Sequence, residues 1–191
     1  MIAGPVYAHW HGRDKSGRPI VRIRPRLDLE DEEPQAKLMR MVGVLEAVRR
    51  VADESGFVLV CDYAGSVSST DVGLSLSCMR VLFDHFPGLL ARAFFLECPT
   101  AFWIGWGAIK VFLSAEVESK LQFLTACDDS AGVRVYRELE AEFPPEALEW
   151  EYGGSSTYLK ASGLDTFRAG SSQQPLADCK DTAKSSWFGW D

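Results

Sequence analysis

Histidines and paired cysteines are scarce in this sequence. It contains only three histidines, and its five cysteines are widely spaced, with no C-x-x-C pair. An odd number of separated cysteines argues against a disulfide framework or a zinc ribbon and favours reduced thiols. His9 and His11 would share one face of a strand, but His85 is the only other histidine. We therefore expect no metal site and an ordinary edge-strand role for the pair.

Motifs of nucleotide binding and hydrolysis are also absent. Residues 12–19, G-R-D-K-S-G-R-P, resemble a degenerate phosphate loop. However, Pro19 stands where the hydroxyl of Ser or Thr is needed, and it has no backbone N–H. There is no G-x-S-x-G elbow, and no histidine has a defined spacing from Cys61 that would mark a thiol nucleophile. The sequence therefore offers no motif for nucleotide binding, serine hydrolysis or thiol catalysis.

Long apolar runs and an excess of basic residues are missing as well. The most apolar stretch, Ala93–Leu113, is interrupted by Glu97, Pro99 and Lys110, which makes it a poor membrane span. The first residues lack the organisation of a secretory signal. The formal net charge of −7 argues against a nucleic-acid partner. We expect a cytoplasmic protein.

What the sequence does contain is an alternation of strand and helix patterns. Asp14–Gly17 is a turn signal between two short strand patterns, which predicts a hairpin in place of a phosphate loop. The order that follows predicts an α/β sandwich with a mainly parallel sheet of about five strands flanked by helices. The expected strands are Tyr7–His11, Ile20–Arg24, Phe57–Cys61, Ala93–Cys98 and Lys120–Thr125. The expected helices are Pro34–Glu54, Ser69 or Thr70 to Phe86, Thr100–Leu113 and Ser130–Glu142, with Thr100 as a cap.

One domain over residues 1–155 accounts for this pattern. After Gly154 the composition shifts to Ser, Gly, Gln and Asp, which predicts a flexible polar tail over residues 156–191. The last residues, W-F-G-W-D, contain three aromatic side chains. These suit a bilayer interface or a partner groove, although a disordered end is the simpler interpretation.

Five motifs follow one another between residues 5 and 155. They are GRDKSGRPI, VLVCDYAG, FPGLLARAFFLECPTAFW, IKVFLSAEVESKLQFL and PPEALEWEYGG. In this order and spacing they resemble the CRAL-TRIO lipid-binding domain. This is the fold of phosphatidylinositol and phosphatidylcholine transfer proteins and of tocopherol- and retinal-binding proteins. Each motif alone is weakly specific, and the ordered set is the signal.

The resemblance implies a non-enzymatic function in which one lipid occupies an apolar pocket between sheet and helices. A gate helix then moves at the membrane to exchange the lipid. The matching helix, Thr100–Leu113, is apolar on nearly every side, so it is either wholly buried or contacts two apolar environments in turn. The expected lipid-binding residues are Trp10, Phe57, Leu59, Phe102, Trp106, Phe112 and Lys120.

The sequence departs from the family at the polar headgroup positions. Where phosphatidylinositol binders carry Pro-Glu-Arg, this chain has Pro87–Gly88–Leu89. The lysine that acts with that glutamate is retained as Lys120, and without the glutamate we expect it to pair with a nearby Glu at the surface. The positions that match the polar groups of phosphatidylcholine binders are Phe57, Leu59, Trp10 and Val21. These changes favour an apolar lipid, or a phospholipid held in another way.

Two features leave alternatives open. Arg22, Arg24 and Arg26 alternate along one strand face, which predicts either a patch for anionic membranes or a solvated face paired with Asp28–Glu33. The helical bundle that usually precedes this domain has no counterpart here. The chain is then a fragment, a divergent stand-alone domain, or a module that keeps the fold to bind a protein partner.

Overall fold

The computed structural model describes residues 8–25, 33–65, 72–86, 88–111, 113–130 and 133–156. Its strands are β1 (Ala8–Arg13), β2 (Pro19–Ile23), β3 (Phe57–Asp62), β4 (Leu90–Leu96), β5 (Leu121–Leu124), β6 (Asp128–Ser130) and β7 (Val133–Val135). Its helices are α1 (Pro34–Arg49), α2 (Val72–His85), α3 (Thr100–Lys110), α4 (Ala115–Ser119) and α5 (Arg137–Glu142), followed by the 3₁₀ turns η2 (Pro145–Ala147) and η3 (Trp150–Tyr152). Arg26, Ser69, Thr70, Pro87, Phe112 and the expected tail beyond residue 156 lie outside the described residues.

The five-stranded sheet has the order β1-β2-β3-β4-β5. Only β1 is antiparallel to its neighbour; β2 through β5 pair in parallel. The predicted α/β class with a mainly parallel sheet is confirmed. All six residues of β3 are buried, as a central strand covered on both faces requires.

The turn between β1 and β2 is stabilised by the side chain of Asp14. Its Oδ1 accepts hydrogen bonds from the backbone N–H of Ser16 (2.9 Å) and Arg18 (2.8 Å), and its Oδ2 lies 2.6 Å from Nε of Arg18. Gly17 has φ +84°, a conformation that favours glycine. The predicted hairpin is therefore confirmed.

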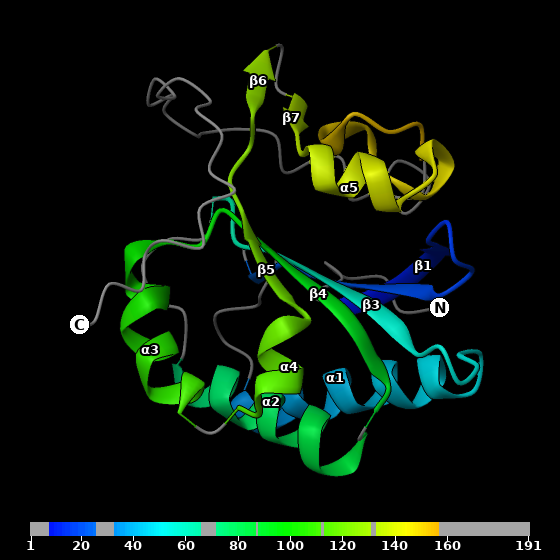
Figure 1. Cartoon of the computed structure of the whole chain (residues 1–191). Helices are drawn as coiled ribbons and strands as arrows, with labels where there is room; N and C mark the ends of the chain where they lie inside the picture. The colour runs from blue at the N-terminus through cyan, green and yellow to red at the C-terminus, as the bar shows by residue number, and fades with distance from the viewer. Residues whose placement is uncertain are drawn as a thin grey trace.

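The two faces of the sheet are covered by different parts of the chain (Figure 1). Helices α1, α2, α3 and α4 lie on one face, and the segment from α5 to η3 covers the other. Alternation along each strand separates the side chains: on β3, Phe57, Leu59 and Cys61 belong to the helical cluster, while Val58 and Val60 pack under the C-terminal segment. No helix in the described ranges is both long and apolar enough to span a bilayer.

The expected helix over Ser130–Glu142 is wrong in its first half. β6 and β7 form an antiparallel pair there, and only Arg137–Glu142 is helical. Arg134 reaches Asp62 and the ring of Tyr136 is buried, so contacts with the sheet outweigh local helix propensity. Helix α1 also ends five residues before its expected limit, at Arg49, and α3 ends three residues early, at Lys110.

The expected cap at Thr100 is wrong as well. Pro99 occupies the N-cap position of α3, no side chain caps the helix, and Thr100 is its first residue.

Gly56 gives a direct test of the sheet's packing. It has φ +77°, and a Cβ there would lie 2.2 Å from the carbonyl oxygen of Leu89. Gly56→Ala should lower the free energy of unfolding by about 2 kcal/mol or more, because strain and a backbone clash add. Gly43→Ala, in the open interior of α1, should raise it by up to about 1 kcal/mol. Urea denaturation of both variants checks this; equal effects would contradict the close approach.

Candidate functional site

Helix α3 has an apolar surface on both sides. Toward the sheet, Phe102 and Trp106 are each only 6% exposed. On the opposite side, Ile104 keeps 79% of its surface exposed, and Trp103, at the flank between the two sides, keeps 45%. Lys110 is the helix's only charged residue. The alternative of a wholly buried helix is therefore wrong, and contact with a second apolar environment stays a prediction.

An aromatic cluster fills the contact between α3 and the sheet. The ring of Phe123 on β5 lies 5.0 Å from the ring of Trp106 and 4.9 Å from that of Trp103, measured between centroids. Phe95 on β4 stacks on Phe123 at 5.2 Å, and Phe102 lies 5.9 Å from Phe95. Aromatic pairs of this kind contribute through dispersion and edge-to-face contact, which do not fix one unique geometry.

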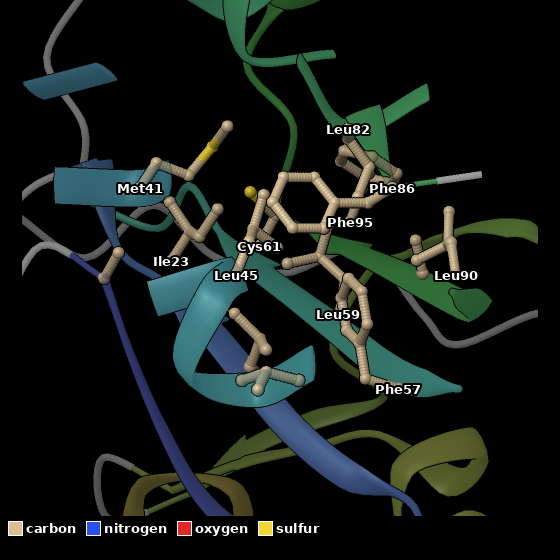
Figure 2. Packing of buried hydrophobic residues seen from close by; sticks show 14 of the residues in the cluster. Ile23, Met41, Leu45, Phe57, Leu59, Cys61, Leu82, Phe86, Leu90 and Phe95 are labelled. Carbon is tan, nitrogen blue, oxygen red and sulfur yellow. The ribbon is translucent and has the colours of Figure 1, made fainter. Parts of the chain in front are cut away.

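The cluster continues beneath α1 and α2, where Met41, Leu45 and Leu82 are among its buried members. Figure 2 shows its deeper part, where β3 and β4 meet the two helices. Burial raises the pKa of the Cys61 thiol to about 12 and raises that of Cys98 as well. Both thiols are therefore protonated near neutral pH and behave as small apolar groups.

Apart from Lys120, the predicted site residues fall into three groups. Phe57, Leu59, Phe102 and Trp106 belong to one apolar cluster. Trp10 lies on the edge strand β1, three strands away from β4, and is 39% exposed, so it is not brought to α3. Phe112 lies outside the described residues. These placements leave the binding role of every one of them a prediction.

Lys120 pairs with a local glutamate. Its Nζ lies 2.9 Å from Oε1 of Glu116, one turn earlier on α4. The hydrogen bond and charge of Lys120 lower the pKa of Glu116. The side chain of Glu116 is 78% exposed, so the pair is at the surface, as expected from the sequence. A second exposed pair joins Lys110 of α3 to Glu118 of α4 at 3.2 Å.

The opposite face of the sheet holds a buried network of charges. Nε of Arg22 donates to Oε2 of Glu149 (2.9 Å), and its two terminal nitrogens donate to the carbonyls of His11 and Ala147. Nη2 of Arg24 lies 2.8 Å from Oε1 of Glu151. The side chains of Arg22 and Arg24 are each only 2% exposed. Both interpretations of these arginines, as a membrane patch and as a solvated face, are therefore wrong.

A second part of the network centres on Asp62. Arg134 donates from both terminal nitrogens to the two oxygens of this carboxylate, each at 3.0 Å, and the hydroxyl of Tyr152 donates to Oδ2 at 2.6 Å. Burial alone would lower the pKa of Arg134, but its hydrogen bonds with Asp62 hold that pKa above the ordinary value. The guanidinium of Arg134 also lies 5.2 Å from the ring centroid of Tyr152. The sheet and the C-terminal layer are thus joined by directed bonds.

His9 lies beside this network. Burial and the neighbouring charges of Arg22 and Arg24 lower its pKa to about 3, so the ring is neutral at physiological pH. No group of three metal-ligating side chains occurs in the part of the chain that the structure describes.

The main residues that sequence reasoning missed are the partners in this network. Glu149 and Glu151 alternate in E-W-E-Y, which is a strand-like spacing, and Asp62 ends an apolar strand. The sequence alone does not show that these carboxylates are buried, because their arginine partners are known only from the structure.

Removing one member of the network should destabilise the fold strongly. Arg22→Leu leaves Glu149 buried without its main partner, so we expect a loss of about 3–5 kcal/mol in the free energy of unfolding. Arg49→Leu is the matched control, because Arg49 pairs with Glu46 at a position 56% exposed, and it should cost less than about 1 kcal/mol. If chemical denaturation shows that the two substitutions lower the free energy of unfolding by similar amounts, Arg22 is not held by Glu149 as described.

Comparison with known proteins agrees with this architecture. Phosphatidylinositol transfer protein CSR1 of Eremothecium gossypii is 28% identical over 154 residues, which are 77% of this chain and 33% of that protein. Phosphatidylinositol transfer protein sfh-5 of Neurospora crassa is 29% identical over 128 residues, 63% of this chain and 34% of that protein. The chain therefore spans about a third of the length of these relatives.

The crystal structure of Sfh5 has a TM-score of 0.52 with this chain at 18% identity, and the match covers 63% of this chain and 47% of that one. At this identity the likeness supports the fold alone. The CRAL/TRIO domain family matches residues 5–154, which is well over half of the sequence. On this match, the chain belongs to the CRAL/TRIO domain family.

Proposed function

We propose that this domain binds a single lipid, or another hydrophobic molecule, in an apolar pocket between the sheet and α3, and transfers or presents it at membranes. The observation that carries the proposal is the apolar surface on both sides of α3. A helix of this composition suits one apolar ligand on its inner side and a bilayer on its outer side. The names of the two phosphatidylinositol transfer relatives support lipid as the ligand class.

The inner side favours an apolar ligand. Phe57, Leu59 and Phe95 on the strands, and Phe102 and Trp106 on α3, are all buried in one cluster. A hydrocarbon chain or apolar ring replaces contacts of the same kind, whereas a charged headgroup would lose its hydration there without a partner. The ligand is therefore an apolar lipid, or a lipid whose headgroup stays near the surface.

Uptake requires α3 to move away from the sheet. The ring contacts of Trp106 and Phe102 with Phe123 and Phe95 would be exchanged for contacts with the ligand. Because dispersion supplies much of these contacts, an apolar ligand of suitable size would offset part of their loss. Neither binding nor release makes or breaks a covalent bond, so the function needs no catalytic residue and no cofactor.

The outer side supports a reversible, peripheral contact with a membrane. Removing an exposed isoleucine side chain such as Ile104 from water contributes about 1.5–3 kcal/mol. Tryptophan, as at position 103, is favoured at the interface between headgroups and hydrocarbon. Two exposed side chains, Trp103 and Ile104, give a membrane affinity small enough for a cytoplasmic protein to bind the bilayer and leave it repeatedly.

A protein-interaction module is the second candidate. The same exposed surface at Trp103 and Ile104 would bind a protein partner, and the close ring packing beneath α3 would then be a permanent core. The two functions differ in ligand content. Native mass spectrometry of the purified protein should find one lipid per chain if the domain is a carrier, and none if it is only a scaffold.

The outer surface of α3 can be tested without disturbing the core. Ile104→Asp should weaken binding to phospholipid vesicles tenfold or more, as expected for a loss of ~1.4 kcal/mol or more, and should slow lipid exchange similarly. Its unfolding free energy should change little, because the side chain is 79% exposed.

Met39→Asp on α1, also an exposed apolar position, is the matched control and should leave vesicle binding unchanged. Vesicle sedimentation and a fluorescent-lipid exchange assay make the comparison. Equal effects of the two substitutions would contradict a specific role for α3. Absence of any lipid exchange by the unmodified protein would overturn the carrier function itself.

Lys120 should contribute little to lipid recognition. Its ammonium already pairs with Glu116 at the surface, where such pairs are worth less than about 1 kcal/mol. We therefore expect Lys120→Ala to leave phosphatidylinositol transfer within about twofold of the unmodified protein. Brisk transfer that this substitution abolishes would show that Lys120 leaves Glu116 to bind a phosphate.

A further inference from the structure

Glu97 has an unusual backbone conformation. Its φ is +51°, and it is the one non-glycine residue in the described chain with a positive φ. It lies between the last residue of β4, Leu96, and the N-cap of α3, Pro99. A side chain with a Cβ is strained in this region, and such strain persists only where surrounding contacts hold it.

Three hydrogen bonds hold Glu97 in place. Its Oε1 accepts from the backbone N–H of Ala126 (2.7 Å) and from the hydroxyl of Tyr136 (3.1 Å). Its own N–H donates to the carbonyl of Leu124 at 3.0 Å. Burial raises the pKa of Tyr136, which keeps its hydroxyl protonated as a donor. The same hydroxyl lies 3.4 Å from Arg134, the partner of Asp62, so Glu97 is linked to the buried network.

The two ends of α3 are held differently. At the start, the partners of Glu97 include Tyr136, which has no exposed surface. At the end, the pair between Lys110 and Glu118 has side chains that are 32% and 43% exposed. Exposed pairs contribute little, so the stronger directed anchor of α3 is at Glu97.

We propose that Glu97 is a strained latch that positions α3: its side-chain bonds to Ala126 and Tyr136 hold the helix against the sheet, while the strain of its left-handed backbone favours release. This inference rests on the proposed function, because release of α3 is the step that admits a ligand. When α3 moves, the backbone of Glu97 relaxes to negative φ as the two bonds break. The balance between these bonds and the strain, added to the ring contacts beneath α3, sets the fraction of molecules with α3 released.

Substitutions at Glu97 separate the bonds from the strain. Glu97→Ala removes the bonds and keeps the strain, and Glu97→Gly removes both. Glu97→Gln keeps Oε1 as an acceptor and is the conservative control. Tyr136→Phe removes one bond from the opposite partner.

Hydrogen exchange of the purified protein without vesicles measures the opening of α3 directly. We expect Glu97→Ala to raise the opening of α3 amides about tenfold relative to those of β3 and β4, whose exchange reports global stability. Glu97→Gly should raise it less than Glu97→Ala, Tyr136→Phe should give an intermediate increase, and Glu97→Gln should match the unmodified protein. A merely structural role would change exchange in α3, β3 and β4 together.

Two results would overturn the latch: equal opening of α3 in Glu97→Ala and Glu97→Gly, or an increase shared by β3 and β4. Lipid exchange with vesicles is measured on the same variants and should rise in the same order as α3 opening. Faster opening with no lipid exchange by any protein would support the latch and count against the carrier function. Lipid exchange by the unmodified protein with unchanged α3 opening in Glu97→Ala would reject the latch alone.

Discussion

The carboxylate of Asp62 is the interaction on which the arrangement of the layers depends. It ends the central strand β3, is 1% exposed, and accepts hydrogen bonds from Arg134 and Tyr152. Both partners come from the C-terminal segment, so this one group joins the middle of the sheet to the layer above it. A buried charge pair of this kind adds little net stability when complete, but its loss is costly, and its geometry accepts only one register between the layers.

The two faces of the sheet are built on different physical principles. Arg22 and Arg24 extend the charged network over one face through Glu149 and Glu151. The hydrogen bonds of Arg22 to Glu149 and to the carbonyl of Ala147 have fixed directions and hold the C-terminal layer. The opposite face relies on rings and aliphatic side chains around Phe95 and Trp106. Because that packing is less directional than hydrogen bonding between charged groups, it tolerates a change of apolar partner more readily. One face is thus suited to stay fixed and the other to rearrange.

Glu97 lies between the charged, hydrogen-bonded face of the sheet and the apolar face. It follows a core strand, begins the connection to an apolar helix, and reaches the charged face through Tyr136. Elements that move to admit ligands are drawn from the less stable parts of a fold, and their motion is controlled at a few anchoring residues. A face with directed charge contacts, an apolar face and a strained residue between them are the features on which the proposed uptake and release of a ligand depend. The match covers about a third of the length of each of the two phosphatidylinositol transfer relatives.

The sequence by itself determined the α/β class, the hairpin at Asp14–Gly17 and the doubly buried strand β3, because these follow from local alternation and turn chemistry. It also determined the unusual apolar composition of α3. Only the tertiary structure decided that Arg22 and Arg24 are buried and that residues 133–135 form a strand instead of a helix. Their partners lie far away in sequence: Glu149 is 127 residues from Arg22, and Arg134 is 72 residues from Asp62. Pairing over such separations is fixed by the packing of layers, which no local pattern encodes.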